Sequence, residues 1–402
     1  MNTLYPYQDE GVRFLRDRNR AYLADGMGLG KTVQAAVAAY QLKLHRVLVI
    51  APASALENWR REWSAWGPKT FSFGAISYAD THLREGRVNG SDWDLVILDE
   101  AHYCKNHKAK RTLAALKVAR AAPRAWLLSG TPMPNNTGEL YAVLRMLWPE
   151  KVDALGIRTF WQWFNHFNHW TQTRYGPRAY GVKNGDELRS ILSGIMLRRR
   201  LEDVAMDLPD LRIETSLLPR DPAFAKMLAD AGVNPDDPEG STSRLRHILG
   251  SYKAPKVGEI LARELEDGAY SKIVVLAYHH IALDDLRTIL APFGVVGFDG
   301  GAPQPERQRA IDRFTNDKSC RVFLAQQNAA GIAINLQAAH EIVLVEPAWT
   351  PDDNLQAIKR IHRIGQDSPC RARIFAVAGS LDEAVMGVVA NKLRMQREVG
   401  LA

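Results

Sequence analysis

The sequence predicts an α/β protein with two parallel-sheet lobes, and three observations support this prediction. Short apolar runs that look like buried strands alternate with helix-like segments through both halves of the chain. Glycine, acidic or hydroxyl residues follow the strand ends of the first half. A glycine-rich turn between strand and helix occurs there and has no counterpart in the second half. Such alternation is typical of parallel sheets with helices on both faces, which bind ligands at the carboxyl ends of their strands.

Composition limits the function classes. The 402 residues suffice for about two domains, and 46% hydrophobic with 24% charged residues is ordinary for a globular protein. The net charge of +7 favours a polyanionic partner such as nucleic acid, although ordinary solubility also explains mild basicity. Cys104, Cys320 and Cys370 lie far apart without any C-x-x-C spacing, so neither a disulfide framework nor a zinc site is indicated. No apolar run reaches membrane-spanning length, so we expect a protein that is neither exported nor membrane-bound.

The first predicted strand, Ala21–Ala24, leads into a turn that fits phosphate binding. Gly28 and Gly30 allow a tight turn whose N–H groups face phosphate oxygens at the start of a helix over 33–40. Lys31 is then expected at the terminal phosphates and Thr32 at Mg²⁺. Because Asp25 replaces the first glycine of the usual pattern, a plain glycine-rich turn is the alternative.

Two adjacent carboxylates follow the apolar strand predicted over 94–98. Asp99 could hold Mg²⁺ and Glu100 could deprotonate an attacking water. An acidic helix N-terminus is the alternative. A strand from Arg124 ends at Ser129 and Thr131, so the strand ends at 25, 99 and 129 are expected to meet at one sheet edge.

The second half repeats the alternation without a phosphate loop, so it is expected to complete the site of the first half. Gln356–Gln366 contains Arg360 and Arg363, which would face one side of a helix and could reach a γ-phosphate. The alternative is a plain basic helix. The predicted strands of this half cover 273–276, 295–298, 322–324, 342–345 and 374–377.

These motifs resemble those of the Swi/Snf-type branch of superfamily-two helicase-like ATPases, in family order along the whole chain. The similar segments are Leu4–Gln8 (Q motif), Asp25–Thr32 (motif I), Asp99–His102 (motif II), Ser129–Pro132 (motif III), Asn328–Leu336 (motif V) and Gln356–Gln366 (motif VI). The chain departs from the family at Gly26 and Ala333, where glutamate and glycine are usual.

The resemblance implies two RecA-like lobes with small helical protrusions. Lobe 1 would cover residues 1–200 with a helical protrusion at about 150–200, a linker would cover 201–215, and lobe 2 would cover 216–402. The segment Met196–Val204, which contains Arg198–Arg200, resembles the linker between the lobes in the family.

The resemblance also implies ATP and Mg²⁺ as cofactors. The implied catalytic residues are Glu100, Asp99, Lys31, Arg360 and Arg363, and the implied ATP-binding residues are Gln8, Asp25, Gly28, Gly30, Lys31 and Thr32. Thr32 and Asp99 would hold Mg²⁺, and His102 and Gln356 would couple the ATP site to the DNA-binding site. The implied DNA-binding residues are Arg60, Ser129, Thr131, Asn335 and Trp349.

The expected function is ATP-driven translocation on double-stranded or forked DNA, with fork remodelling or strand annealing as the finer possibility. A strand-separating DNA or RNA helicase shares the same motifs and is one alternative. A DNA-binding module that binds nucleotide without hydrolysis is another. A monomeric motor is expected, cytoplasmic in a bacterium or a virus-infected cell and nuclear in a eukaryote; the sequence names no protein partner.

Overall fold

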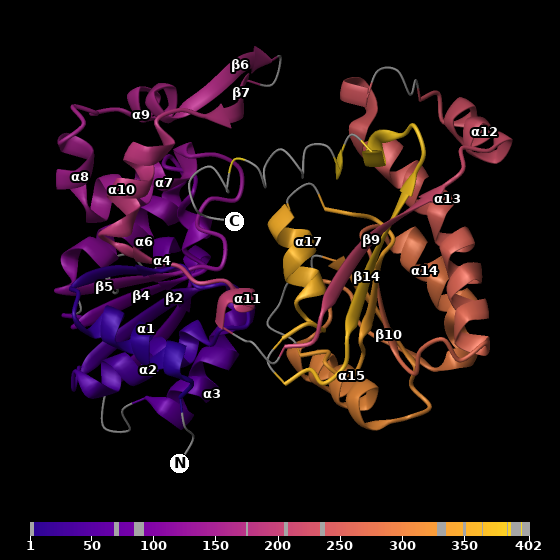
Figure 1. Cartoon of the computed structure of the whole chain (residues 1–402), viewed down its shortest axis with the longest axis horizontal. Coiled ribbons are helices and arrows are strands. Elements are labelled where there is room, and N and C mark those ends of the chain that lie inside the picture. The colour runs from indigo at the N-terminus through magenta and orange to yellow at the C-terminus, as the bar shows by residue number, and fades with distance from the viewer. Residues whose placement is uncertain are drawn as a thin grey trace. The chain divides into compact units, whose positions relative to one another are not determined.

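The chain folds into two compact units. The computed structural model describes residues 4–67, 72–83, 92–173, 176–204, 208–233, 238–327, 335–348, 351–363, 365–383, 385–386 and 395. Unit 1 contains Met1–Met206 and Asn391–Ala402, and unit 2 contains Asp207–Ala390. Each unit is built on a six-stranded parallel sheet (Figure 1), which confirms the predicted fold class.

The sheet of unit 1 has the strand order β3-β2-β4-β5-β1-β8, and every neighbouring pair is parallel. The strands are β1 (Arg20–Leu23), β2 (Arg46–Ala51), β3 (Ser72–Ser77), β4 (Leu95–Asp99), β5 (Arg124–Leu128) and β8 (Met196–Leu197). Four of them, β1, β2, β4 and β5, coincide with apolar runs of the sequence, the run of β2 being Val47–Ile50. The two edge strands, β3 and β8, are additional: β3 is mostly half-buried and β8 has two residues, so neither produces a clear apolar run.

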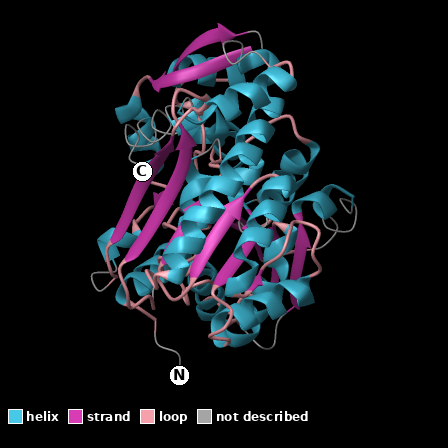
Figure 2. Ribbon diagram, turned by 90° about the vertical axis from the view of Figure 1, so that its right-hand side faces the viewer, coloured by secondary structure: helices cyan, strands magenta, loops and turns pink. Residues whose placement is uncertain are grey.

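Helices flank the strands of unit 2 in Figure 2, and helices likewise cover both faces of the sheet of unit 1. The helices of unit 1 are α1 (Pro6–Arg16), α2 (Lys31–Gln41), α3 (Leu56–Trp66), α4 (Tyr78–Leu83), α6 (Lys110–Ala121), α7 (Gly138–Leu147) and α11 (Leu201–Val204), with short 3₁₀ turns η1 (Ala53–Ala55) and η2 (Ala101–Cys104). Side chains of α1, α2 and α3 pack on one face, and side chains of α6 and α7 pack on the other. Two buried clusters, one on each face, therefore hold the strand ends in place.

The region at about 150–200 is not purely helical as predicted. It contains α8 (Pro149–Asp153), α9 (Phe160–Phe167) and α10 (Gly185–Ser193), but also a two-stranded antiparallel hairpin of β6 (Asn168–Thr173) and β7 (Gly176–Val182). The hairpin extends beyond α9 (Figure 1). Two aromatic side chains of α9, Trp163 and Phe167, are fully buried in the core.

The sheet of unit 2 has the order β11-β12-β10-β13-β14-β9, again parallel throughout. Its strands are β9 (Leu211–Leu218), β10 (Ile273–Ala277), β11 (Val295–Val296), β12 (Val322–Gln326), β13 (Glu341–Leu344) and β14 (Cys370–Val377). Its helices are α12 (Pro222–Asp230), α13 (Pro238–Glu266), α14 (His280–Leu290), η3 (Ala291–Phe293), α15 (Gln304–Asn316) and α17 (Pro351–Ile358).

The segment predicted as a linker is partly a strand of unit 2. β9 begins at Leu211 and pairs with β14 over its whole length, so the second half of 201–215 belongs to the sheet. Arg212 and Glu214 interrupt its apolar pattern, which is why the sequence did not reveal it.

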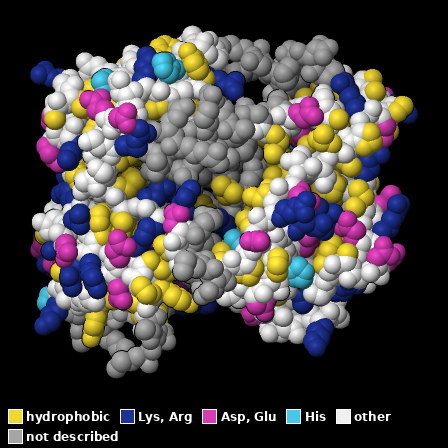
Figure 3. Space-filling view, in the orientation of Figure 1, with side chains coloured by type: hydrophobic (Ala, Val, Ile, Leu, Met, Phe, Trp, Pro, Cys, Tyr) yellow, Lys and Arg dark blue, Asp and Glu magenta, His cyan; other side chains and the backbone are white. Residues whose placement is uncertain are grey.

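Charges are mixed on the surface. Figure 3 shows Lys and Arg interspersed with Asp and Glu on the visible face of each unit. The net charge of +7 is therefore not gathered in a single basic patch on this face.

Candidate active site

Three neighbouring strands of unit 1 bring their carboxyl ends together. β4, β5 and β1 are adjacent, and Leu128 of β5 pairs with both Asp99 and Leu23. Loops that follow parallel strands leave the sheet at the same edge. The glycine-rich turn, the acidic pair and the Ser129–Thr131 segment therefore meet, as the sequence predicted.

The glycine-rich turn needs its glycines. Gly28 and Gly30 have φ values of 85° and 70°, which glycine adopts readily and other residues rarely do. A Cβ on Gly30 would lie 2.5 Å from Nε2 of Gln8. Gln8 is thus held against the turn: Nε2 donates to the carbonyl of Leu29 at 3.4 Å, and Oε1 accepts the N–H of Tyr5 at 3.0 Å.

Lys31 is the first residue of α2 and points back into the turn. Its Nζ donates to the carbonyl oxygens of Asp25 at 2.8 Å and Gly26 at 3.2 Å. Burial lowers the pKa of this ammonium, while the carboxylates of Glu100, Asp25 and Asp99 oppose that shift. A phosphate is a stronger acceptor for an ammonium than two neutral carbonyls, so Lys31 is placed to exchange them for an anion.

The Asp25 carboxylate supports the turn from within the protein. It is fully buried; Oδ1 accepts from Nε of Arg199 at 2.9 Å, and Oδ2 accepts from Nη2 of Arg199 at 2.5 Å and from Nε2 of Gln34 at 3.1 Å. Both oxygens are therefore engaged by protein donors. This contradicts a direct nucleotide contact through the Asp25 side chain.

Arg198 and Arg199, here called the arginine brace, connect the strand-end loops. Arg198 donates to the carbonyls of Ala24 at 2.9 Å and Gly130 at 3.1 Å. Arg199 also donates to the carbonyl of Tyr7 and lies 3.1 Å from a carboxylate oxygen of Glu10. The run of arginines was visible in the sequence, but their partners were not, and the sequence assigned them only to a linker.

Asp99 and Glu100 form a half-buried acidic pair. Oδ2 of Asp99 accepts from Nε1 of Trp59 at 2.7 Å, and Oδ1 accepts the N–H of Glu100 at 3.0 Å. Burial first, and then the charge of Glu100, raise the pKa of Asp99 to about 6. Two adjacent carboxylates that are partly removed from water cost free energy unless a cation binds to them.

The donors at this edge fit Mg²⁺. Magnesium prefers oxygen ligands and is commonly held by one or two carboxylates together with substrate phosphates. Asp99 supplies a carboxylate, and Thr32 supplies a hydroxyl from the first turn of α2. The described part of the chain contains no group of three or more His, Cys, Asp or Glu residues that could hold a metal without such help.

His102 joins the loops after β4 and β5. Its Nδ1 lies 3.2 Å from Oε2 of Glu100, 3.0 Å from Oγ of Ser129 and 3.3 Å from Oγ1 of Thr131. Ser129 is fully buried and Thr131 is 4% exposed. Their burial contradicts the predicted DNA contacts of these two side chains, which are partners of His102 instead. Glu100 itself has a left-handed backbone with φ of 49°, a strained conformation that is common at functional sites.

In unit 2 the predicted helix over 356–366 is shorter than expected. α17 ends at Ile358, so half-buried Gln356 lies on the helix, whereas Arg360 and Arg363 lie on the turns that follow. Gln366 holds the segment that follows the helix, because its Nε2 lies 3.0 Å from the carbonyl oxygen of Ile361, 3.1 Å from that of Ala339 and 3.3 Å from that of Gln337.

The other predicted DNA-binding residues, Arg60, Asn335 and Trp349, stay predictions. Arg60 is exposed and lies 3.5 Å from Glu57. Asn335 is exposed and donates to Oε1 of Gln337 at 2.7 Å. Trp349 and Ala333 lie outside the described residues. No described helix is both long and apolar enough to cross a bilayer.

Comparison with known protein families decides the relationship. A model of the SNF2-related domain matches residues 7–84 and 72–222, which is more than half of the chain, and a model of the helicase conserved C-terminal domain matches residues 256–365. The chain belongs to the SNF2 family. Membership in this family implies use of ATP.

This SNF2 chain is similar over almost its whole length to several larger proteins. The homolog of SWI/SNF-related matrix-associated actin-dependent regulator of chromatin subfamily A-like protein 1 from Caenorhabditis elegans is 28% identical over 433 residues, covering 99% of this chain and 62% of the relative. The DNA annealing helicase and endonuclease ZRANB3 from Bos taurus is 28% identical over 439 residues, covering 98% and 40%. The chain thus spans about half the length of the curated relatives it matches. The solved Sulfolobus solfataricus SWI2/SNF2 ATPase core in complex with dsDNA aligns with 24% identity over 100% of this chain and 93% of that chain, with a TM-score of 0.46.

Proposed function

We propose that this SNF2 chain hydrolyses ATP and couples hydrolysis to movement along double-stranded DNA. The observation that carries the proposal is the meeting of Lys31 with Asp99 and Glu100 at one sheet edge, where the two carboxylates act on the charge of the buried ammonium. A cation for phosphates, an acid pair and a helix N-terminus at one edge are the requirements of phosphoryl transfer to water.

Each residue has a role in this reaction. Lys31 and the N–H groups of the glycine-rich turn bind the phosphates, and Gln8 is the candidate for the adenine edge. Glu100 accepts a proton from the attacking water. The water oxygen bonds to the γ-phosphorus, and the bond between the γ-phosphorus and the oxygen that bridges it to the β-phosphate breaks. His102 holds the Glu100 loop against Ser129. Thr32 and Asp99 would hold Mg²⁺, which when bound neutralises part of the phosphate charge.

We also propose that Arg360 and Arg363 stabilise the charge that develops on the transferred phosphoryl group. Guanidinium groups act in this way in many ATPases, where they raise the rate by about 10³-fold or more. His102 and Gln356 are the proposed coupling residues.

Duplex or forked DNA is the proposed track. The net charge of +7 and the name of the bovine relative, a DNA annealing helicase, support a nucleic-acid partner, with fork remodelling or annealing as the finer possibility. Contacts mainly to phosphates would make binding strongly salt-dependent and weakly sequence-specific. The protein would then act where DNA is, in the cytoplasm of a bacterium or infected cell or in a eukaryotic nucleus.

The test is steady-state ATP hydrolysis with no nucleic acid and with duplex DNA, forked DNA, single-stranded DNA or RNA, each at low and moderate salt. Stimulation chiefly by duplex or forked DNA is expected. Stimulation chiefly by single strands or RNA would support a strand-separating helicase. Nucleotide binding without hydrolysis under any condition would support a binding module and refute the proposal.

A further inference from the structure

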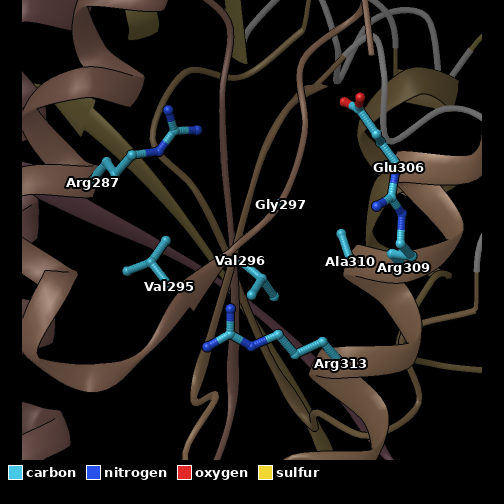
Figure 4. Close-up of a pocket in the computed structure, with 8 residues that line it drawn as sticks. All are labelled: Arg287, Val295, Val296, Gly297, Glu306, Arg309, Ala310 and Arg313. Atoms are coloured by element: carbon cyan, nitrogen blue, oxygen red, sulfur yellow. The ribbon is translucent and has the colours of Figure 1, made fainter. Parts of the chain in front are cut away.

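A hollow of about 520 Å³ lies at the free edge of the sheet of unit 2, beside β11. It is lined by Arg287 of α14, by Val295, Val296 and Gly297 at the edge strand, and by Glu306, Arg309, Ala310 and Arg313 of α15 (Figure 4). Three arginines against one glutamate make it electropositive. None of these residues belongs to the proposed ATPase site.

The arginines approach the strand from both faces of the sheet. Leu286 of α14 packs in the cluster that contains Val275, whereas Phe314 of α15 packs in the cluster that contains Val274. Neighbouring residues of one strand point to opposite faces. Arg287 therefore flanks the edge on one face, and the two arginines of α15 flank it on the other, as Figure 4 shows with β11 between them.

These guanidinium groups are available to a ligand. All three arginines are exposed. Arg313 lies 3.6 Å from Asp317 in an exposed pair, which is a weak interaction. Arg309 donates to the carbonyl of Pro305 at 3.3 Å. Within the ranges that the structure describes, Arg287 forms no ion pair with an acidic side chain.

The backbone of the edge strand is also available. The carbonyls of Gly294 and Phe298 accept N–H groups of β12 at 3.3 and 3.4 Å, so these alternate positions face the sheet. In a parallel pair the intervening residues direct their N–H and C=O groups the other way. Val295 therefore presents its backbone groups outward, as an edge strand does to an incoming strand.

We propose that this edge binds an extended acidic peptide segment of a partner protein by strand addition. An added strand pairs its backbone with Val295 and directs alternate side chains to opposite faces. Carboxylates at those positions meet Arg287 on one face and Arg309 or Arg313 on the other. Duplex DNA offers phosphates but no backbone amides, and the hollow has the volume of a small-ligand or short-peptide site, so the geometry favours a peptide.

The probe is a short fluorescein-labelled peptide of alternating glutamate and valine, titrated with the full chain and followed by fluorescence anisotropy. Binding is expected, and Arg309→Glu and Arg287→Glu should each weaken it about tenfold or more, the loss expected for one charge-assisted contact. Arg263→Glu is the matched control, since Arg263 is 76% exposed on α13 and far along the chain from the hollow. It should leave binding unchanged.

Two further probes separate strand addition from simple charge attraction. The same peptide methylated at alternate backbone nitrogens should bind much more weakly, and a lysine–valine peptide should not bind. Equal binding of the methylated peptide, or no binding of the glutamate–valine peptide, would overturn the proposal. So would displacement of the peptide by duplex DNA together with loss of DNA-stimulated hydrolysis in Arg309→Glu, because the site would then bind nucleic acid. Peptide binding is measured without ATP, so its outcome is independent of the proposed hydrolysis.

Discussion

The arginine brace allows a sharp test of how the phosphate-binding turn is held. Arg199→Met removes the guanidinium that binds both oxygens of Asp25, whose side chain is fully buried while that of Arg199 is 10% exposed. Breaking a buried ion pair on one side costs about 3–5 kcal/mol, because the other charge is left without a partner. We expect the free energy of unfolding of unit 1 to fall by about 3 kcal/mol and the KM for ATP to rise.

Urea unfolding followed by tryptophan fluorescence measures this change. Nine of the ten tryptophans precede residue 207, Trp349 being the tenth, so the signal reports unit 1. The matched control is Arg200→Met: Arg200 is 55% exposed and pairs with Asp203 at 2.9 Å, so about 1 kcal/mol or less is expected.

A double-mutant cycle with Asp25→Asn isolates the pair. The double variant should be more stable than the sum of the single effects predicts, with a coupling of about 2 kcal/mol. An Arg199→Met loss no larger than that of Arg200→Met, or a coupling near zero, would refute the assignment of the brace.

Three further predictions concern the loops after β4 and β5. Glu100→Gln should keep the affinity for a fluorescent ATP analogue and lower steady-state hydrolysis by about 10²-fold or more, since it removes the proton acceptor; unchanged turnover would exclude this role. Asp99→Asn should stabilise the nucleotide-free protein while abolishing hydrolysis. The folded protein holds the Asp99 proton up to a pKa of about 6, whereas the unfolded chain releases it near 4, so stability is lost as pH rises through this window. The gain in thermal midpoint should therefore grow from about pH 4 to about pH 6 and then level off, and a gain independent of pH would contradict it. Ser129→Ala removes the hydroxyl that contacts His102, so kcat should fall about tenfold while the KM for DNA stays unchanged. A raised KM for DNA with normal kcat would instead support a DNA contact of Ser129.

Much of the fold was predictable because its signals are local. β4 and β10 are runs of four or five apolar residues that are buried on both faces, and such runs are recognisable without knowing their neighbours. Three of the edge strands, β3, β8 and β9, were not predictable in this way. β9 is exposed or half-buried over seven of its eight residues, and β8 has only two residues. Their strand conformation depends on the neighbour with which they pair.

The same distinction applies to the short helix α17. The sequence predicted a helix through Arg363 from spacing alone, which is a local criterion. The helix ends at Ile358, and Gln366 holds the segment that follows it by bonding to carbonyls of residues as distant as Gln337. No local pattern contains that partner.

The sequence by itself determined the chemistry at the strand ends: a glycine-rich turn with Lys31, and the acidic pair of Asp99 and Glu100. These groups follow strands, and the parallel order of the sheet brings strand ends to one edge. Only the tertiary structure decided which side chains face a ligand and which support the site. Asp25 is bound to Arg199, which lies 174 residues away, and Ser129 is buried against His102. Contacts between such distant residues depend on how the sheet and its loops pack, and motif spacing does not contain that information.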